Sequence, residues 1–383
     1  MLPFLSILTL FLLTSVALFF AGQRGKLRYL RDISPDTKIG SVSIIVAARN
    51  EDRKIEKAMK TLLQQQDLCF EIIAVNDRST DDTGEILDRL AFSSPRLRVI
   101  HITNLPKGWV GKNHALYCAA LSARTDYLLF TDADVFFTPK AIAKAITLAR
   151  TEGFDHVAVA PQTKMPGLLL TAFIVTFSIL FGIRYRPWNA SNPKSRAYIG
   201  IGAFNLVKTS AYQAIGGHSK ISMSPIDDLD LGRLLKDAGY RQTLVGGNGN
   251  VTVEWYSGLK ELVEGLMKNS FSVVNYNLLA ALLTGLVLAS VSLGPMIGLI
   301  FGSQSVFWFS AGSVLCILFI FTGTALTQNL PPASIVFLPA AIVLIIYIFW
   351  RAALLATLNS GITWRGTFYS LEEIKAQRVV SFK

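Results

Sequence analysis

Three acidic islands in this sequence have the residue types and the spacing to do chemistry. They are Asn76-Asp77, Asp132-Ala133-Asp134 and Asp227-Asp228-Leu229-Asp230. The first two directly follow short apolar runs, at residues 71–75 and 127–130. Because open α/β sheets bind ligands beyond the carboxyl ends of their buried strands, we expect these side chains to line a ligand site. A pair spaced Asp-x-Asp can there share a hard divalent cation with a diphosphate group.

The pair formed by Asp132 and Asp134 is the predicted metal site. Breaking the bond between a sugar and a diphosphate builds negative charge on the leaving group, and a divalent cation offsets that charge. We expect Asp134 to hold Mg2+ or Mn2+, while Asp132 contacts the metal or the sugar. The alternative is a solvated loop, since Asp-x-Asp is a common sequence.

A second set of residues is predicted to bind the nucleotide end of such a ligand. The apolar run 42–46 ends in a polar turn that can surround a nucleoside, and Asp77 can accept the N3–H of a uracil ring or bind ribose. Lys112 lies near the expected start of a helix, where phosphate is favoured. Asn-Asp at a strand end is also typical of caps and turns, which is the alternative for Asp77. The full predicted set is Ala47, Arg49, Asn50, Glu51, Asp77, Lys112 and Asp132.

Asp228 is the candidate general base. In a sugar transfer with inversion, a carboxylate takes the proton of the acceptor hydroxyl as its oxygen attacks the anomeric carbon. The acidic run lies just before an expected helix, so the alternative is helix N-capping, which we expect of Asp227 and Asp230. Upstream, the glycine-containing run 199–205 is small and flexible enough to lie against a bound sugar or acceptor.

The elements that must position these residues alternate along the chain. Alternation of strands with helices argues for βαβ units and a parallel sheet. The predicted fold class is therefore α/β, with one domain over residues 40–277. The expected strands are 42–46, 71–75, 97–102, 127–131 and 155–160, and the expected helices are about 51–66, 80–91 and 111–124.

The remaining sequence is too apolar for an ordinary soluble enzyme. The chain of 383 residues is 51% hydrophobic, its mean hydropathy is +0.42, and charged residues are absent from 1–23 and 269–350. A membrane span needs about 20 apolar residues. We therefore expect an uncleaved N-terminal anchor at 1–23 and a C-terminal transmembrane region at 278–356. The expected spans are about 2–21, 278–301, 305–326 and 334–356.

The segment 166–183 is nearly long enough to cross a bilayer as well. A full crossing would put Asp132 and Asp228 on opposite sides of the membrane. We therefore expect this segment to lie in the membrane interface. The alternative is a buried helix of the domain core.

Basic residues set the expected orientation. By the positive-inside rule, the basic residues that follow the anchor predict that the next domain is cytoplasmic. The expected location is the cell membrane, with several spans. The net charge of +11 indicates attraction to a membrane surface. Since no nucleic-acid-binding motif is present in the sequence, no nucleic-acid partner is expected. The basic residues after the anchor are Arg24, Lys26, Arg28 and Arg31.

The sequence leaves open on which side of the membrane the basic tail, residues 357–383, lies. Three full C-terminal spans after a cytoplasmic domain place the tail outside, whereas its charges favour the inside. With the tail on the inside, one apolar segment is re-entrant, or two of them act as one hairpin. The charges in question are Arg351, Arg365, Lys375, Arg378 and Lys383.

Taken together, the motifs resemble those of membrane-anchored family 2 glycosyltransferases with the GT-A fold, over about residues 41–270. Within that family the chain is similar to hopanoid-associated and carotenoid (diaponeurosporenoate-type) glycosyltransferases. The Gln-x-x-Arg-Trp motif of processive members is absent, and Lys268-Asn269 is its nearest replacement, which argues against a polymer synthase. The features shared with these two types are the run 106–113, Trp255-Tyr256-x-Gly258 leading to Gly265-x-x-Lys268-Asn269, and the tail motif Thr363-Trp-Arg-Gly366 with Tyr369.

This resemblance implies an inverting transferase that moves a hexose from a UDP-sugar to a hydroxyl or carboxyl of a membrane lipid at the cytoplasmic face. The acceptor it implies is a hopanoid, a carotenoid or a similar lipid. Two alternatives are kept: a polyprenyl-phosphate sugar or polysaccharide synthase, and a non-catalytic membrane protein with a nucleotide-binding fold. Detection of polymer would favour the first alternative, and a lack of UDP release would favour the second.

Overall fold

The computed structural model describes residues 2–23, 25–36 and 40–376. Arg24 and the last seven tail residues, including Arg378 and Lys383, lie outside this described part. Over the described ranges the chain folds into two compact units. The sheet unit comprises Leu27–Thr163, Tyr185–Glu254 and Trp364–Lys383, and the helical unit comprises Met1–Lys26, Lys164–Arg184 and Trp255–Thr363.

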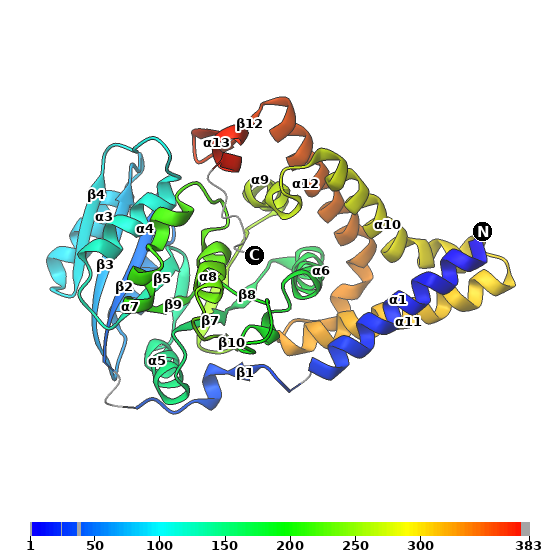
Figure 1. The fold of residues 1–383 in the computed structure, drawn as a ribbon, viewed down its shortest axis with the longest axis horizontal. Coiled ribbons are helices and arrows are strands. Elements are labelled where there is room, and N and C mark those ends of the chain that lie inside the picture. The colour runs from blue at the N-terminus through cyan, green and yellow to red at the C-terminus, as the bar shows by residue number, and fades with distance from the viewer. Residues whose placement is uncertain (1, 24, 37–39, 377–383) are drawn as a thin grey trace. The chain divides into compact units, whose positions relative to one another are not determined.

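The sheet unit is built on a mainly parallel β-sheet (Figure 1). Within the described residues this sheet has eight strands, in the order β1-β10-β7-β9-β5-β2-β3-β4. Neighbouring strands are parallel, except that β9 runs antiparallel to both β5 and β7. The predicted α/β class is confirmed. The strands are β1 (Arg28–Tyr29), β2 (Ser41–Ala48), β3 (Cys69–Asp77), β4 (Leu97–Ile102), β5 (Tyr127–Asp132), β7 (His156–Ala160), β9 (Asn205–Lys208) and β10 (Gln242–Gly246).

Helices cover both faces of this sheet. They are α2 (Ile55–Leu63), α3 (Thr83–Ser93), α4 (Gly111–Ser122), α5 (Ala141–Glu152), α7 (Thr209–Ala214) and α8 (Asp227–Asp237). In β2, Ile44 packs into a core with α2 and α5, whereas the next residue, Ile45, packs into a core with α4 and α8. Because successive strand residues point to opposite faces, a continuous apolar run is what a strand buried between two helix layers requires.

The remaining strands and a short helix form smaller elements. Strands β6, β11 and β8 form a small separate sheet, and β12 pairs with β13 near the C-terminus. Helix α13 follows β13. Their bounds are β6 (Val135–Phe137), β8 (Gln162–Lys164), β11 (Val251–Glu254), β12 (Gly361–Trp364), β13 (Thr367–Ser370) and α13 (Leu371–Ala376).

The element boundaries predicted from sequence agree with the structure within a few residues, and one difference bears on the site. The helix expected from residue 51 begins only at Ile55. Asn50 has a left-handed φ of 55°, and the backbone N–H of Glu51 donates to Thr83 Oγ1 at 2.8 Å. The turn after β2 is thus bound to the neighbouring loop, which keeps its first residues out of the helix.

The helical unit consists of long apolar helices. In the part of the chain that the structure describes, five helices are long and apolar enough to cross a membrane: α1, α6, α10, α11 and α12. Helix α1 lies alongside α11 (Figure 1). The helices of this unit are α1 (Leu2–Gln23), α6 (Gly167–Tyr185), α9 (Leu259–Ser270), α10 (Leu278–Phe301), α11 (Gln304–Thr327) and α12 (Leu338–Leu358).

Helix α6 covers the segment for which the sequence left an interfacial and a buried location open. Its side chains Leu170 and Phe173 pack against Leu262, Phe321 and Ile342 of the helical unit. They do not contribute to either core of the sheet. Helix α6 thus packs with the other apolar helices, as a segment apolar on all sides does, and its location at a membrane interface stays a prediction.

The division into units constrains how the chain crosses a membrane. The chain leaves the sheet unit after Thr163 and re-enters it at Tyr185, the last residue of α6; it leaves again after Glu254 and re-enters at Trp364. A folded domain with open sheet edges cannot straddle the hydrocarbon layer. For a chain whose apolar helices lie in a membrane, we therefore expect a return to the same side after α6 and again between Glu254 and Trp364. Three full crossings by α10, α11 and α12 do not meet this condition.

We expect the start of the sheet unit and the C-terminal tail to lie on one side of the membrane, the cytoplasmic side. Cysteines introduced singly as Asp36→Cys and Glu372→Cys, in a chain whose native cysteines are replaced by alanine, should both resist an impermeant thiol reagent in intact cells. Both should react once the cells are permeabilised. Labelling of only one of them in intact cells would contradict the shared side, and labelling of both would reverse the orientation.

Candidate active site

The structure brings the acidic islands together at the carboxyl edge of the sheet. Strands β3 and β5 flank β2, so that Ala48 pairs with Asn76 and Ala47 pairs with Asp132. The third island forms the first turn of α8. Parallel strands end at the same edge, which is why motifs far apart in the sequence meet here.

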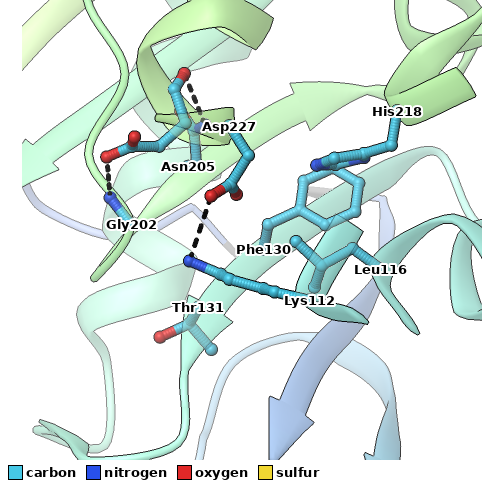
Figure 2. A pocket seen from close by; sticks show the side chains of 9 residues that line it. Lys112, Leu116, Phe130, Thr131, Gly202, Asn205, His218 and Asp227 are labelled. Carbon is cyan, nitrogen blue, oxygen red and sulfur yellow. Dashed lines mark hydrogen bonds and ion pairs between the residues drawn. The ribbon is translucent and has the colours of Figure 1, made fainter. Parts of the chain in front are cut away.

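Lys112 connects the second island to the third. Its Nζ atom lies 2.8 Å from Asp132 Oδ1 and 3.5 Å from Asp227 Oδ1. Figure 2 shows its side chain passing Leu116 and Phe130 toward Asp227. Burial alone would lower the pKa of Lys112, but the surrounding carboxylates of Asp132, Asp227 and Asp228 raise it above its usual value. Lys112 therefore stays positively charged among these acids, where a phosphate group could also bind it.

Asp228 is held in place by the glycine-containing run that the sequence placed near a sugar or acceptor. The backbone N–H of Gly202 donates to Asp228 Oδ2 at 2.8 Å (Figure 2). A Cβ atom at Gly202 would lie 2.8 Å from Asp132 Oδ2, and one at Gly200 would lie 1.7 Å from the Asp228 carbonyl oxygen. Glycine at these positions allows the loop to approach the Asp228 main chain and the Asp132 carboxylate so closely.

The pKa values of two carboxyl groups are raised at this edge. Burial, followed by the charge of Asp227, raises the pKa of Asp228 to about 7, against the opposing effect of Lys112. Burial also raises the pKa of Asp134 to about 6, together with the charges of Asp132 and Glu51. A carboxyl with a pKa near 7 can accept a proton at neutral pH, and a buried acid beside other acids favours a cation nearby.

The expectation that Asp227 and Asp230 cap α8 is wrong. The helix begins at Asp227 itself, its N-cap position is Ile226, and no side chain caps it among the described residues. Asp230 Oδ2 instead accepts a hydrogen bond from Ser224 Oγ at 2.6 Å. Both acids lie within the first turn, where negative charge interacts favourably with the helix dipole.

The two acids of the predicted metal pair, Asp132 and Asp134, fit a cation that arrives with a diphosphate. Among the described residues, no cluster of three His, Cys, Asp or Glu side chains is arranged to hold a metal ion by itself. Magnesium is commonly held by one or two carboxylates together with substrate phosphates, so Asp132 and Asp134 are a sufficient protein contribution. Each has a lysine partner in the structure, Asp134 Oδ2 lying 3.6 Å from Lys54 Nζ.

The residues predicted to bind a nucleoside line two adjacent turns. Asn50 Oδ1 accepts the backbone N–H of Thr80 at 2.8 Å and so ties the turn after β2 to the turn after β3. Buried Asp77 accepts two hydrogen bonds from Arg78, at 2.7 and 3.0 Å. Arg49 Nη1 lies 4.0 Å from Asp77 Oδ2. These side chains thus form one network at the end of β3.

Sequence reasoning missed several residues of the site. Arg78 and Lys54 carry no motif of their own, and the sequence signal for Arg78 is its place directly after Asp77. In the structure Arg78 has a left-handed φ of 55°. The apolar wall behind Lys112 was also missed. It includes His218, whose pKa burial lowers to about 3, and whose Nδ1 lies 2.8 Å from the Tyr212 hydroxyl. This histidine stays neutral and has a packing role.

Comparison with known proteins agrees with this geometry. Residues 43–214 match the model of the glycosyl transferase family 2. The chain is 28% identical over 236 residues to a 4,4'-diaponeurosporenoate glycosyltransferase of Staphylococcus haemolyticus, and 26% identical over 231 residues to that of Staphylococcus aureus strain USA300. In both cases the match covers 60% of this chain and 60% of the relative's length.

A solved structure shows the same fold. It is that of a mannosyltransferase from Pyrobaculum calidifontis in complex with GDP-Man and Mn2+, with a TM-score of 0.58 and 18% identity, covering 94% of this chain and 99% of that chain. At this identity the likeness concerns the fold alone. Residues 43–214 of the chain are therefore a glycosyl transferase family 2 domain, and the fold is of the GT-A type.

Proposed function

We propose that the chain is an inverting glycosyltransferase that moves a hexose from a UDP-sugar to a membrane lipid at the cytoplasmic face. The observation that supports this proposal most is the arrangement around Lys112. Its ammonium group lies between Asp132 of the predicted metal pair and Asp227, the residue next to Asp228. A base and a charge-stabilising group are thereby within one site, as an acyl- or glycosyl-type displacement with a charged leaving group requires.

In this proposal each residue acts on one part of the reaction. Asp228, fixed by the Gly202 N–H, takes the proton from an acceptor hydroxyl as the oxygen attacks the anomeric carbon. Lys112 interacts with the diphosphate as negative charge develops on it. When bound by Asp132 and Asp134, a divalent cation would supply further compensation of that charge. The turns containing Arg49, Asn50, Glu51 and Asp77 hold the nucleoside, and the backbone of Ala47 borders it.

A lipid acceptor is supported by the helical unit and by the relatives. Five described helices could cross a membrane by length and composition. The two relatives are named for diaponeurosporenoate as the molecule that they glycosylate. A lipid is confined to the bilayer, so apolar helices in the same chain keep the enzyme where its acceptor is.

The proposal is tested by supplying donors to the purified protein in lipid nanodiscs. With Mn2+ or Mg2+ and a total lipid extract, we expect UDP release from one of the common UDP-hexoses and mass spectrometry to show a lipid heavier by a single hexose. GDP-mannose is assayed in parallel. Polymer as the product would favour a synthase, transfer only from GDP-mannose would change the donor, and no release from any donor would contradict an enzymatic role.

Turnover should depend on pH through Asp228. Only the deprotonated carboxyl can act as a base, and its pKa is raised to about 7. The kcat measured at saturating donor and acceptor should therefore be level above this pH and fall about tenfold per unit below it. Removal of the Asp227 charge by Asp227→Asn should move the midpoint to lower pH, because that charge helps to raise it. A kcat that is flat from pH 5.5 to 8 would exclude Asp228 as the base.

A further inference from the structure

The tail motif Thr363-Trp-Arg-Gly366 with Tyr369 lies at the turn between β12 and β13. From Trp364 onward it belongs to the sheet unit. The two residues between β12 and β13, Arg365 and Gly366, have φ values of 46° and 76°. Positive φ at both central residues is the pattern of a tight type I′ turn, in which glycine is favoured at the second position. The chain thereby places Arg365 at a defined turn rather than on a loose tail.

The side chains of Arg365 and Thr367 contact the turn that is predicted to bind the nucleoside. The Arg365 guanidinium donates to the Arg49 carbonyl oxygen and to Glu51 Oε1. Thr367 Oγ1 accepts from Arg49 Nη1 at 3.4 Å. These contacts bridge more than 300 residues of sequence and end on the turn after β2, which is predicted to hold the nucleoside.

Tyr369 makes a second contact, at the start of α4. Its hydroxyl accepts the backbone N–H of Gly111 at 3.3 Å, and the tyrosine side chain is buried. This N–H is one of the donors that a helix leaves free at its N-terminus. The adjacent residue is Lys112, the predicted phosphate ligand. The segment therefore touches both the nucleoside end and the phosphate end of the predicted donor site.

An unpartnered atom also points to a ligand here. Arg49 Nε is buried and, among the described residues, has no hydrogen-bond partner. A buried donor without an acceptor is costly, and an oxygen of a bound nucleotide would satisfy it. Arg49 is also the residue whose guanidinium contacts Thr367 and whose main-chain carbonyl binds Arg365.

We propose that the C-terminal segment 364–370 forms a wall of the donor site, and that Arg365 is a positioning residue that fixes the turn of Arg49 and Glu51 for nucleotide binding. This inference rests on the proposed function, since the ligand is the nucleoside diphosphate of the donor. The Arg365 guanidinium compensates the charge of Glu51 and binds the main-chain carbonyl of Arg49. The Arg49 side chain is thereby left to face the nucleotide. Donor affinity then depends on the tail, whereas acceptor binding does not.

The test measures UDP and GDP binding by calorimetry, and donor and acceptor KM, in the full-length protein. Arg365→Gln should weaken binding of the preferred nucleotide and raise donor KM by about tenfold or more, because it removes charge-assisted hydrogen bonds. Acceptor KM should stay within about twofold. The matched control is Arg89→Gln, which removes another arginine paired with a glutamate, Glu56 at 3.1 Å, and should leave both constants unchanged.

Coupling between the residues separates positioning from general stability. In a double-mutant cycle, Glu51→Gln and Arg365→Gln should be clearly non-additive for UDP affinity, since each removes the same contact. Tyr369→Phe removes only a hydroxyl and should weaken UDP binding several-fold without a change in the unfolding temperature. If Arg365→Gln does not fold, the Tyr369→Phe variant alone tests the proposal.

The outcomes distinguish this inference from the proposed function. If the wild-type protein releases UDP but Arg365→Gln and Tyr369→Phe match the control, only the role of the segment is refuted. Tighter nucleotide binding in Arg365→Gln would also refute it, because the segment would then compete with the donor. A wild-type protein that binds neither UDP nor GDP would remove the proposed function and this inference with it.

Discussion

Replacement of Asp228 by asparagine should lower turnover by about 10²–10⁴-fold, the usual contribution of general-base catalysis, while UDP affinity changes by less than about tenfold. Asparagine keeps the size of the side chain but loses most of its basicity. The base acts only on the reacting hydroxyl, so its loss affects the transition state rather than the bound donor. The measurement is kcat with saturating donor and acceptor, beside UDP binding by calorimetry.

The neighbouring acids are the matched controls for this variant. Asp230→Asn should be mild, because an amide oxygen can still accept the hydrogen bond from Ser224. Asp227→Asn should change the pH midpoint and weaken the contact with Lys112 without removing the base. Near-normal turnover in Asp228→Asn, with a large loss in either control, would move the base to that carboxylate. Loss of UDP binding in Asp228→Asn would instead indicate a donor-site role.

The acceptor chemistry gives a second check on Asp228. A carboxylic acid acceptor is already ionised at neutral pH and has no proton to give up, whereas a hydroxyl keeps its proton until the oxygen attacks. The loss in Asp228→Asn should therefore be large with a hydroxyl lipid and small with a carboxylate lipid. An equally large loss with both would show that Asp228 acts through charge or geometry and not as a base.

The features that the sequence predicted well are those with local or periodic signals. Continuous apolar runs such as 42–46 gave the buried parallel strands, and the acids that follow them gave the sheet edge of the site. Long uncharged stretches gave the apolar helices. The antiparallel strand β9 was not predicted, because it returns from the long excursion that contains α6 and has no local pattern that encodes its direction.

Contacts between distant residues could not be predicted in the same way. Nothing near Arg365 in the sequence indicates that it binds Glu51, and nothing near Lys112 distinguishes Asp132 from a phosphate as its partner. The misassigned caps of α8 have a different cause. Whether an acid precedes a helix or occupies its first turn depends on a boundary shift of about one residue, which is finer than sequence patterns resolve.

Chelation of divalent metal should abolish turnover, and Mn2+ or Mg2+ should restore it in the wild-type protein but not in Asp134→Ala. Partial burial, together with the charges of Asp132 and Glu51, raises the pKa of Asp134 to about 6. A divalent cation would relieve this repulsion and compensate the charge of a diphosphate. Removal of the carboxylate should therefore cost metal affinity and turnover together, by a factor of at least about 10².

Nucleotide binding provides a readout that does not depend on turnover. Mn2+ should increase UDP affinity in the wild-type protein and have little effect in Asp134→Ala. Because a metal ligand must be deprotonated, this increase should also diminish as the pH falls through about 6, the pKa of Asp134. Full activity in excess EDTA would assign the charge compensation to Lys54 and Lys112, which already pair with Asp134 and Asp132. In that case Lys112→Ala, rather than Asp134→Ala, should be the variant that loses turnover.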